Sequence, residues 1–173
     1  DGLESRVEFW KKVFTEYGND DLIIHDRVHV HLIYDVASES DVKSRVRMVG
    51  SALEEVRDNF RNPEDLSPTG KQVYDAIAGA GLTISDKFVE ELRANIHTQR
   101  GIKERFRQGL IRSGRYVESF QSVFEKQGIP AEIALLPLVE PSFENRAYSK
   151  AGAAGIWQFT RGTGRMYMKI NRS

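Results

Sequence analysis

The chain contains no cysteine, carries no formal net charge and has no long hydrophobic run. Without cysteine it can form neither a disulfide bond nor a thiolate metal site. Its composition therefore does not indicate whether it resides in an oxidising or a reducing compartment. Basic and acidic residues both number 25, which argues against a general polyanion-binding protein and against nucleic acid as a partner. No apolar run approaches the roughly 20 residues that are needed to cross a bilayer.

No signal peptide is visible, and the first residue is Asp1 rather than methionine. We therefore interpret the chain as a processed or trimmed product whose targeting segment has been removed. Hydrophobic residues make up 40% and charged residues 29% of the chain, which is ordinary for a soluble globular protein. Its 173 residues are enough to bury a core, and this length favours one domain or two small ones.

The first hundred residues combine helical periodicity with one β-rich segment. Apolar side chains recur at helical spacing over residues 3–17, and Gly18 is suited to end that helix. The segment DLIIHDRVHVHLIYDVAS is rich in β-branched residues and predicts two short strands, about 21–25 and 29–36, that turn near Asp26. The remaining pattern is almost wholly helical, so the expected fold class is mainly α (α+β overall), with one small β-hairpin at about 21–36.

In the rest of the chain, serine, proline and glycine residues mark where the expected helices begin and end. Helices are expected over about residues 41–60, 67–79 (or 67–81), 85–97, 102–112, 115–127 and 129–140. Ser38 or Ser40 is expected to cap the first of these, while Ser67 and Ser85 are expected to cap the next two. Gly128 should end the fifth helix, and Pro137 should kink the sixth helix or mark a helix junction. The most defensible domain boundary lies near residue 100, which gives domains of 1–100 and 101–173.

Two polar clusters allow a binding interpretation. His29 and His31 alternate on the second predicted strand and would share a face, but two imidazoles without a third ligand are a poor metal site. No metal is therefore predicted, and a polar strand face is preferred. Six cations lie between Arg100 and Arg115 against one acid, Glu104. The preferred interpretation is a solvated helix face, and the alternative is a helix that flanks an anionic substrate.

The stretch LLPLVEPSFENRAYSKAGAAGIWQF, residues 135–159, places a single acid, Glu140, at the end of an apolar helix. Apolar surroundings disfavour the charged carboxylate, so we expect a raised pKa and a general acid. Gly155 allows close approach of the backbone to a ligand, and Trp157 and Phe159 offer flat faces for sugar rings. Gln158 supplies a donor and an acceptor. These residues predict a sugar site; the alternative is a tightly packed helix-loop-helix core.

The segment IPAEIALLPLVEPSFENRAYSKAGAAGIWQFTRGTGRMY closely resembles the start of the catalytic domain of soluble-type lytic transglycosylases, the SLT domain. The resemblance is nearest to the membrane-bound lytic murein transglycosylase D kind. The preceding segment RGIKERFRQGLIRSGRYVESFQSVFEKQG resembles the helical lead-in of those proteins, and FWKKVF with LIIHD resembles their amino-terminal segment. The resemblance implies that residues 101–173 form the helical lead-in and the amino-terminal part of a lysozyme-like domain.

The resemblance also implies an activity. Such enzymes cleave the MurNAc–GlcNAc β-1,4 bond of peptidoglycan without water and without a cofactor, leaving 1,6-anhydro-muramyl ends. Glu140 would be the single acid/base: it protonates the leaving oxygen and then takes a proton from the 6-hydroxyl of the sugar. The substrate's acetamido group would replace the second carboxylate of other glycosidases. The expected substrate-binding residues are Ser142, Gly155, Trp157, Gln158 and Phe159.

The implied setting is the periplasm or cell envelope, with an outer-membrane anchor upstream of Asp1 and peptidoglycan glycan strands as the partner. The sequence departs from the family pattern at Pro141, where relatives usually carry serine, and at Glu144, where they usually carry asparagine. We interpret Glu144 as a surface residue rather than a second acid.

The family's later Ala-Tyr-Asn motif does not occur before Ser173. We therefore expect the chain alone to have little or no activity. We also expect it to self-associate through apolar faces around 133–139 and 156–168. The alternative function is a non-catalytic peptidoglycan-binding or scaffolding module.

Overall fold

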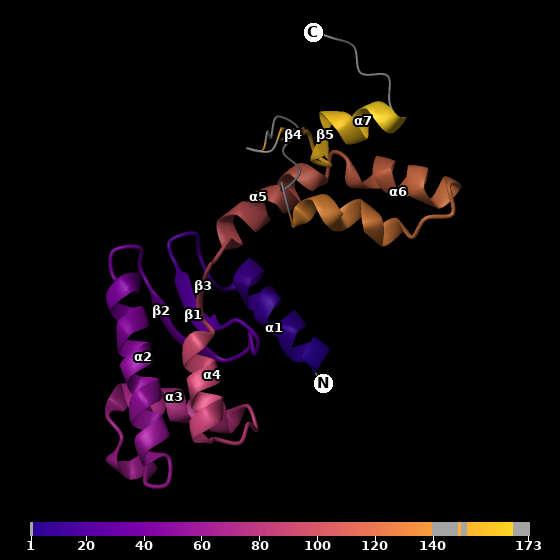
Figure 1. The fold of residues 1–173 in the computed structure, drawn as a ribbon. Coiled ribbons are helices and arrows are strands. Elements are labelled where there is room, and N and C mark those ends of the chain that lie inside the picture. Colours follow the sequence, from indigo (N-terminus) through magenta and orange to yellow (C-terminus); the bar gives the residue numbers. More distant parts are fainter. Residues whose placement is uncertain (1, 140–148, 150–151, 168–173) are drawn as a thin grey trace. The chain divides into compact units, whose positions relative to one another are not determined.

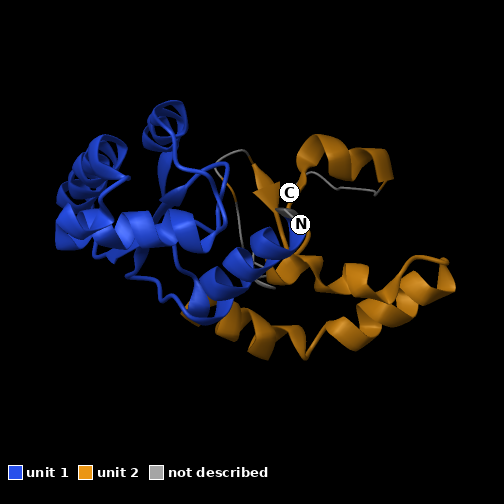
Figure 2. Ribbon diagram, turned by 90° about the horizontal axis from the view of Figure 1, so that it is seen from below, with its two compact units in different colours: residues 1–103 blue, residues 104–173 orange. Residues whose placement is uncertain are grey.

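The structure, a computed structural model of the 173-residue chain, describes residues 2–139, 149 and 152–167. The described residues are mainly helical, with one three-stranded antiparallel sheet and one short hairpin, which confirms the expected fold class (Figure 1). The chain divides into two compact units, Asp1–Lys103 and Glu104–Ser173 (Figure 2). None of the helices in the described part combines the length and the apolar character that spanning a membrane requires.

The elements of the first unit are α1 (Gly2–Thr15), β1 (Leu22–Asp26), β2 (Ile33–Ala37), α2 (Val42–Asn59), η1 (Pro63–Asp65), α3 (Pro68–Gly79), α4 (Asp86–Ala94) and β3 (Ile96–Arg100). The second unit follows with α5 (Lys103–Ser113), α6 (Val117–Lys126), η2 (Ala131–Leu138), β4 (Ala153–Ala154), β5 (Phe159–Thr160) and α7 (Arg161–Tyr167). Both η elements are 3₁₀ helices.

The sheet of the first unit has the order β2-β1-β3, and the central strand β1 is antiparallel to both neighbours. Every residue of β1 is buried, because alternate side chains point to opposite faces and both faces are covered. Ile24 belongs to the larger core cluster, which α2, α3 and α4 complete. Ile23 packs on the other face against Phe9 and Val13 of α1. The small sheet therefore lies between α1 on one side and three helices on the other (Figure 1).

The predicted hairpin is present, but the second strand begins at Ile33 rather than at residue 29. Residues 27–31 form a loop that the side chain of Asp26 organises. One carboxylate oxygen of Asp26 accepts hydrogen bonds from the backbone N–H of Val28, at 2.8 Å, and of His29, at 2.6 Å. Such a local turn competes with strand pairing. The prediction that His29 and His31 share a strand face is therefore wrong.

The predicted helix over 85–97 ends earlier, at Ala94, and the following residues form the unpredicted strand β3. The cause lies far away in the sequence. β1 has a second edge whose backbone groups need partners, and β3 supplies them. The pairing is closed at both ends: Arg27 N donates to Asn95 O at 2.9 Å, and Gly101 N donates to Asp21 O at 2.9 Å. Long-range pairing has overridden the local helical pattern.

The N-caps of two helices are confirmed. The hydroxyls of Ser67 and Ser85 accept hydrogen bonds from the backbone N–H three residues on, at 3.1 and 3.3 Å. The prediction for α2 is wrong, since its N-cap is Asp41 rather than Ser38 or Ser40, and the Asp41 side chain forms no capping bond.

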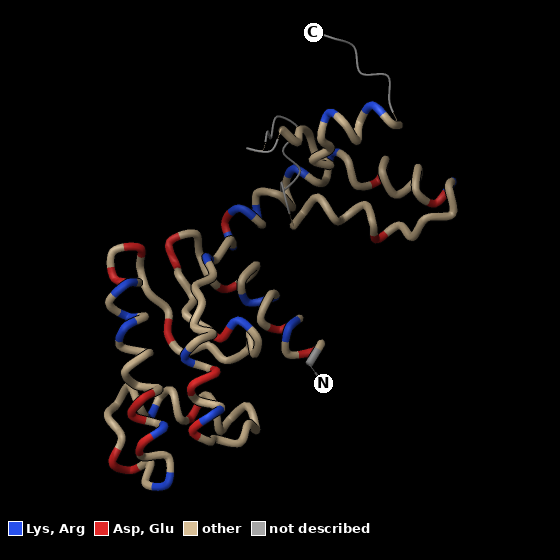
Figure 3. The backbone as a smooth tube through the Cα atoms, in the orientation of Figure 1, with Lys and Arg blue, Asp and Glu red and all other residues tan. Residues whose placement is uncertain are grey.

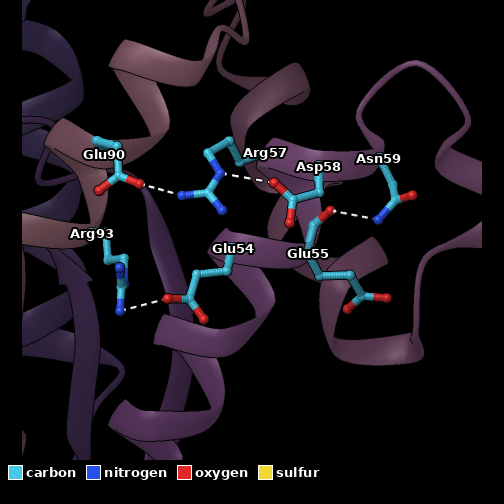
Figure 4. Close-up of polar contacts among 7 residues, drawn as sticks. All are labelled: Glu54, Glu55, Arg57, Asp58, Asn59, Glu90 and Arg93. Atoms are coloured by element: carbon cyan, nitrogen blue, oxygen red, sulfur yellow. Dashed lines mark hydrogen bonds and ion pairs between the residues drawn. The ribbon is translucent and has the colours of Figure 1, made fainter.

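Ion pairs connect α2 with α4 on the solvent side of the core (Figure 4). Arg57 of α2 pairs with Glu90 of α4, and Arg93 of α4 pairs with Glu54 of α2 at 2.6 Å. Exposed pairs of this kind contribute about 0–1 kcal/mol each. Burial of apolar side chains between the helices is the main source of stability, because the core cluster holds fully buried residues from both helices, including Leu53 and Leu92.

At the end of the first unit, the backbone of residues 101–103 packs against the C-terminal end of α1 and the residues that follow it. The backbone N–H of Ile102 donates to Val13 O at 3.1 Å, and that of Lys103 donates to Tyr17 O at 3.0 Å. A Cβ atom at Gly101 would lie 2.4 Å from the carbonyl oxygen of Gly18, closer than real Cβ contacts. This position therefore requires glycine.

In the second unit, α6 and η2 pack against each other as a helical pair. Gly128, at φ 69°, ends α6 as predicted. Its N–H donates to Glu125 O at 3.0 Å while the N–H of Ile129 donates to Phe124 O at 2.9 Å, the bond pair of a Schellman motif. The expected sixth helix is a 3₁₀ helix, and Pro137 within it lacks a backbone donor.

Candidate functional site

The predicted site residues fall into two groups. Glu140 and Ser142, like the neighbouring Pro141 and Glu144, lie outside the described residues. The other predicted site residues lie together on a short hairpin of the second unit: Gly155, Trp157, Gln158 and Phe159.

This hairpin is formed by β4 and β5, in which Ala154 pairs with Phe159. Residues 155–158 are its turn. Gly155 has φ 77°, and Gln158 has φ 48°, a conformation that non-glycine residues seldom adopt. The carbonyl oxygen of Gly155 accepts two bonds from Gln158, from the backbone N–H at 3.2 Å and from Nε2 at 3.0 Å. The side-chain amide of Gln158 therefore stabilises the turn that presents it.

The indole of Trp157 packs against α6. Its ring centroid lies 5.4 Å from that of Phe120 and 5.7 Å from that of Phe124. Phe120 also stacks on Tyr116 at 6.0 Å. Aromatic pairs at these separations contribute about 0.5–1.5 kcal/mol beyond area burial. Trp157 thus joins the hairpin to the helical pair, and this contact accounts for its half-buried state.

The sequence interpretation missed this aromatic row, although its signal is present. Tyr116, Phe120 and Phe124 are spaced four residues apart, which places them on one face of a helix. An apolar face that runs along α6 needs a covering partner, and the tryptophan of the hairpin provides one.

Phe159 is the exposed aromatic of the hairpin, with 47% of its surface accessible. The next residue, Thr160, immediately precedes α7, and its hydroxyl accepts a hydrogen bond from Thr163 N in the first turn of that helix at 3.2 Å. At the other end, Ser149 N donates to Ala153 O at 2.8 Å, and the Ser149 hydroxyl accepts from Ala153 N at 3.0 Å. The hairpin is therefore anchored at both ends, with the Phe159 ring facing solvent.

The residues that precede position 140 are apolar, and several are exposed. Leu136 and Val139 are 56% and 57% accessible, whereas Ala134 and Leu138 are buried. η2 therefore has an apolar solvent-facing side as well as a packed side.

The histidines of the first unit take part in the fold. His25 is buried, its ring lies 4.6 Å from that of Phe9, and Nδ1 is hydrogen-bonded to the carbonyl oxygen of Asp26 at 2.9 Å. Burial lowers the pKa of His25. The rings of His29 and His31 are 6.3 Å apart in the loop. Among the described residues, no group of three or more His, Cys, Asp or Glu side chains is placed to hold a metal ion.

Comparison with known proteins agrees with the sequence resemblance. Residues 119–173 match the family model of the transglycosylase SLT domain. Over 57 residues, 33% of this chain, the sequence is 42% identical to the membrane-bound lytic murein transglycosylase D of Escherichia coli (strain K12). Over 62 residues, 36% of this chain, it is 37% identical to a protein of Alteromonas sp. (strain M-1) named for tributyltin chloride resistance.

These matches cover 13% of the length of the Escherichia coli protein and 30% of the Alteromonas protein. The predicted resemblance to lytic transglycosylases is thereby confirmed for the C-terminal third of the chain.

Proposed function

We propose, from the SLT domain match over residues 119–173, that this chain is part of a lytic transglycosylase that acts on peptidoglycan. The reaction is cleavage of the MurNAc–GlcNAc β-1,4 bond with formation of a 1,6-anhydro-muramyl end. The bond between C1 and the leaving oxygen breaks, and the sugar's own 6-hydroxyl forms the new bond to C1. No water is consumed.

Glu140 is the single acid/base in this proposal. Its carboxyl group first donates a proton to the leaving oxygen, and the resulting carboxylate then removes the proton of the 6-hydroxyl, so the group returns to its starting state. In this proposal the carboxyl group starts in its protonated form, as a general acid requires. The family match is the observation that carries this assignment, since it includes position 140.

The described hairpin would form part of the substrate site. The exposed ring of Phe159 is available for stacking on a sugar, while Trp157 and Gln158 hold the turn in place. Ser142 and Gly155 complete the proposed substrate-binding set. A peptidoglycan substrate supports a location in the cell envelope, and we propose the periplasmic side with an anchor in the outer membrane.

Substitution of the acid in the full-length protein tests the assignment. We expect Glu140→Gln to lower the release of anhydro-muropeptides from sacculi by about 10²- to 10⁴-fold, the usual contribution of a general acid or base. Binding to insoluble sacculi should stay within about twofold, because glutamine keeps the shape of the side chain. Release is measured by chromatography and mass spectrometry, and binding by co-sedimentation.

Glu144→Gln is the matched control, because it removes a carboxylate four residues away that has no role in the proposed reaction. It should release anhydro-muropeptides at the wild-type rate. Unchanged release by Glu140→Gln would overturn the catalytic assignment. If the wild-type full-length protein sediments with sacculi and releases no such products, the protein is instead a non-catalytic peptidoglycan-binding or scaffolding module.

A further inference from the structure

A groove of about 440 Å³ runs between α2 and β3 in the first unit. One wall is the N-terminal part of α2, from Val42 to Arg47, and the other wall is β3, from Ile96 to Thr98. Val42, Val46 and Ile96 also pack on the larger core cluster, so the floor of the groove is apolar and firmly held.

The strand wall of this groove is an open sheet edge. β3 is the last strand in the order β2-β1-β3. In an antiparallel pair, alternate residues direct their N–H and C=O groups toward the partner strand. Asn95 and Gly101 bond to the β1 side, so by alternation His97 and Gln99 do the same. The backbone groups of the intervening residues, Ile96, Thr98 and Arg100, therefore point to the outer edge. The carbonyl oxygen of Arg100 accepts a hydrogen bond there from Gln99 Nε2 at 2.9 Å.

The helix wall is basic. The first half of α2 carries Lys43, Arg45 and Arg47 without an acidic residue, and Figure 3 shows that acidic residues appear only in its C-terminal half. Arg45 pairs with Asp35 at 3.4 Å. Lys43 and Arg47 are exposed, line the groove and form no ion pair with any described residue. The groove therefore attracts an anionic ligand.

The spacing of the two cations matches an extended chain. Lys43 and Arg47 are four residues apart on α2, and a helix rises about 1.5 Å per residue, so they are separated by about 6 Å along the axis. Side chains on one face of a strand recur every second residue, about 6.6–6.8 Å apart. A strand paired with β3 would thus present two carboxylates at alternate positions to these two cations.

We propose that this groove binds an extended acidic peptide segment that adds a strand to β3, with carboxylates at positions i and i+2 facing Lys43 and Arg47. Main-chain bonds to the outward groups of Ile96 and Thr98 and to the backbone N–H of Arg100 hold the peptide, and the cations select its sequence. A second copy of this chain is disfavoured as the occupant, because its β3 edge would bring a second basic helix wall against the first. This surface is independent of the proposed transglycosylase site.

The binding test uses the ¹⁵N-labelled 173-residue chain and the capped peptide Thr-Thr-Glu-Val-Glu-Thr-Thr. We expect titration to shift the amide resonances of Ile96, Thr98 and Arg100, and amide hydrogen exchange at these three positions to slow. Two control peptides keep the length: one replaces both glutamates with glutamine, and one places the glutamates side by side, which directs them to opposite faces. Both should bind more weakly, and salt should weaken the binding of the first peptide.

Two protein variants separate the charges from the strand edge. Lys43→Gln combined with Arg47→Gln should weaken binding by roughly five- to thirty-fold, whereas the matched double variant Arg61→Gln with Lys71→Gln, exposed cations elsewhere in the unit, should bind as wild type. Thr98→Pro removes an outward N–H without removing a bond to β1 and should abolish binding. Thr98→Val keeps that N–H and should retain binding.

Three results would overturn the proposal. The first is the absence of any shift at these amides with millimolar peptide. The second is binding that leaves their hydrogen exchange unchanged, because that would be charge attraction without strand addition. The third is equal binding of the glutamate and glutamine peptides. If Thr98→Pro fails to fold by its amide spectrum, the Lys43→Gln and Arg47→Gln double variant decides the role of the charges.

Discussion

At the scale of single residues, two histidines of the first unit, His25 and His31, have pKa values that burial lowers. His25 is 3% exposed, and its Nε2 atom has no hydrogen-bond partner among the described residues. Burial is the largest cause of its lowered pKa, and His97 acts in the same direction, while the carbonyl and carboxylate of Asp26 oppose it. The pKa of His31 is also lowered, first by burial and then by His29. Burial in the folded first unit therefore favours the neutral form of both imidazoles.

This burial predicts that the first unit loses stability in mild acid. The unfolded chain takes up protons on histidine near pH 6.5, whereas the folded unit takes them up only at lower pH. The unfolded state then binds more protons, so the free energy of unfolding falls as pH drops below about 6.5 and is fully retained above it. Urea unfolding followed by Trp10 fluorescence, with Trp157→Phe to silence the second unit, measures this.

His25→Phe is the variant that isolates the histidine, because the new ring can occupy the space beside Phe9 without titrating. Its free energy of unfolding should depend less steeply on pH between 6.5 and 5 than that of the parent. His31 should leave a residual slope in the same direction. Identical slopes for the two proteins would show that His25 is not responsible.

At the scale of single elements, glycines in the left-handed conformation end α3 and α6. α3 ends with two glycines of different conformation: Gly79 is helical, and Gly81 has φ 69°. Gly81 N donates to Ala78 O at 2.9 Å and Leu82 N donates to Ile77 O at 3.3 Å, as in the motif that ends α6. A Cβ atom at either glycine would meet nothing within 4 Å, so only backbone conformation distinguishes the two positions.

Alanine substitution at these two glycines should therefore have opposite effects. Gly79→Ala should stabilise the first unit by roughly 0.4–1 kcal/mol, because alanine restricts the unfolded chain and fits the helix. Gly81→Ala should destabilise it by about 1–2 kcal/mol, because an L side chain clashes in the left-handed conformation. Urea unfolding measures both variants, and a change of the same sign would contradict this account of the helix end.

At the scale of the whole molecule, the two units differ in what holds them together. Both clusters of fully buried apolar residues, the larger one around Leu53 and the smaller one around Val13, draw only on residues up to Ile102. The described part of the second unit has few fully buried residues and relies on the pairing of α6 with η2 and on the aromatic contacts of Trp157.

This difference predicts that residues 1–103 fold alone. The isolated segment should unfold cooperatively in urea, and its amide spectrum should reproduce the resonances of Ile23, Ile24 and Leu53 in the 173-residue chain. A shorter segment that ends at Asn95 is the comparison. It lacks β3 and residues 101–103, so one edge of β1 is left unpaired, and we expect it to be unfolded. A disordered spectrum for residues 1–103 would contradict the prediction.

The sequence by itself determined the mainly helical class, the caps at Ser67 and Ser85, the stop at Gly128 and the SLT resemblance. These features depend on neighbouring residues: a cap needs a hydroxyl three residues before an N–H, and a motif is a run of adjacent letters. For the same reason the sequence allowed the prediction of Glu140, which stays a prediction because it lies outside the described residues.

The tertiary structure alone decided what depends on distant partners. Residues 96–100 became a strand because β1, some 70 residues earlier, had an unpaired edge, and local periodicity cannot report such a need. His29 and His31 lie in a loop rather than in the predicted strand, because the Asp26 carboxylate accepts hydrogen bonds from the backbone of that loop. Trp157 packs on α6 because Phe120 and Phe124 form a face that lacked a cover. Contacts between distant segments are set by burial and backbone pairing, and only the folded chain specifies them.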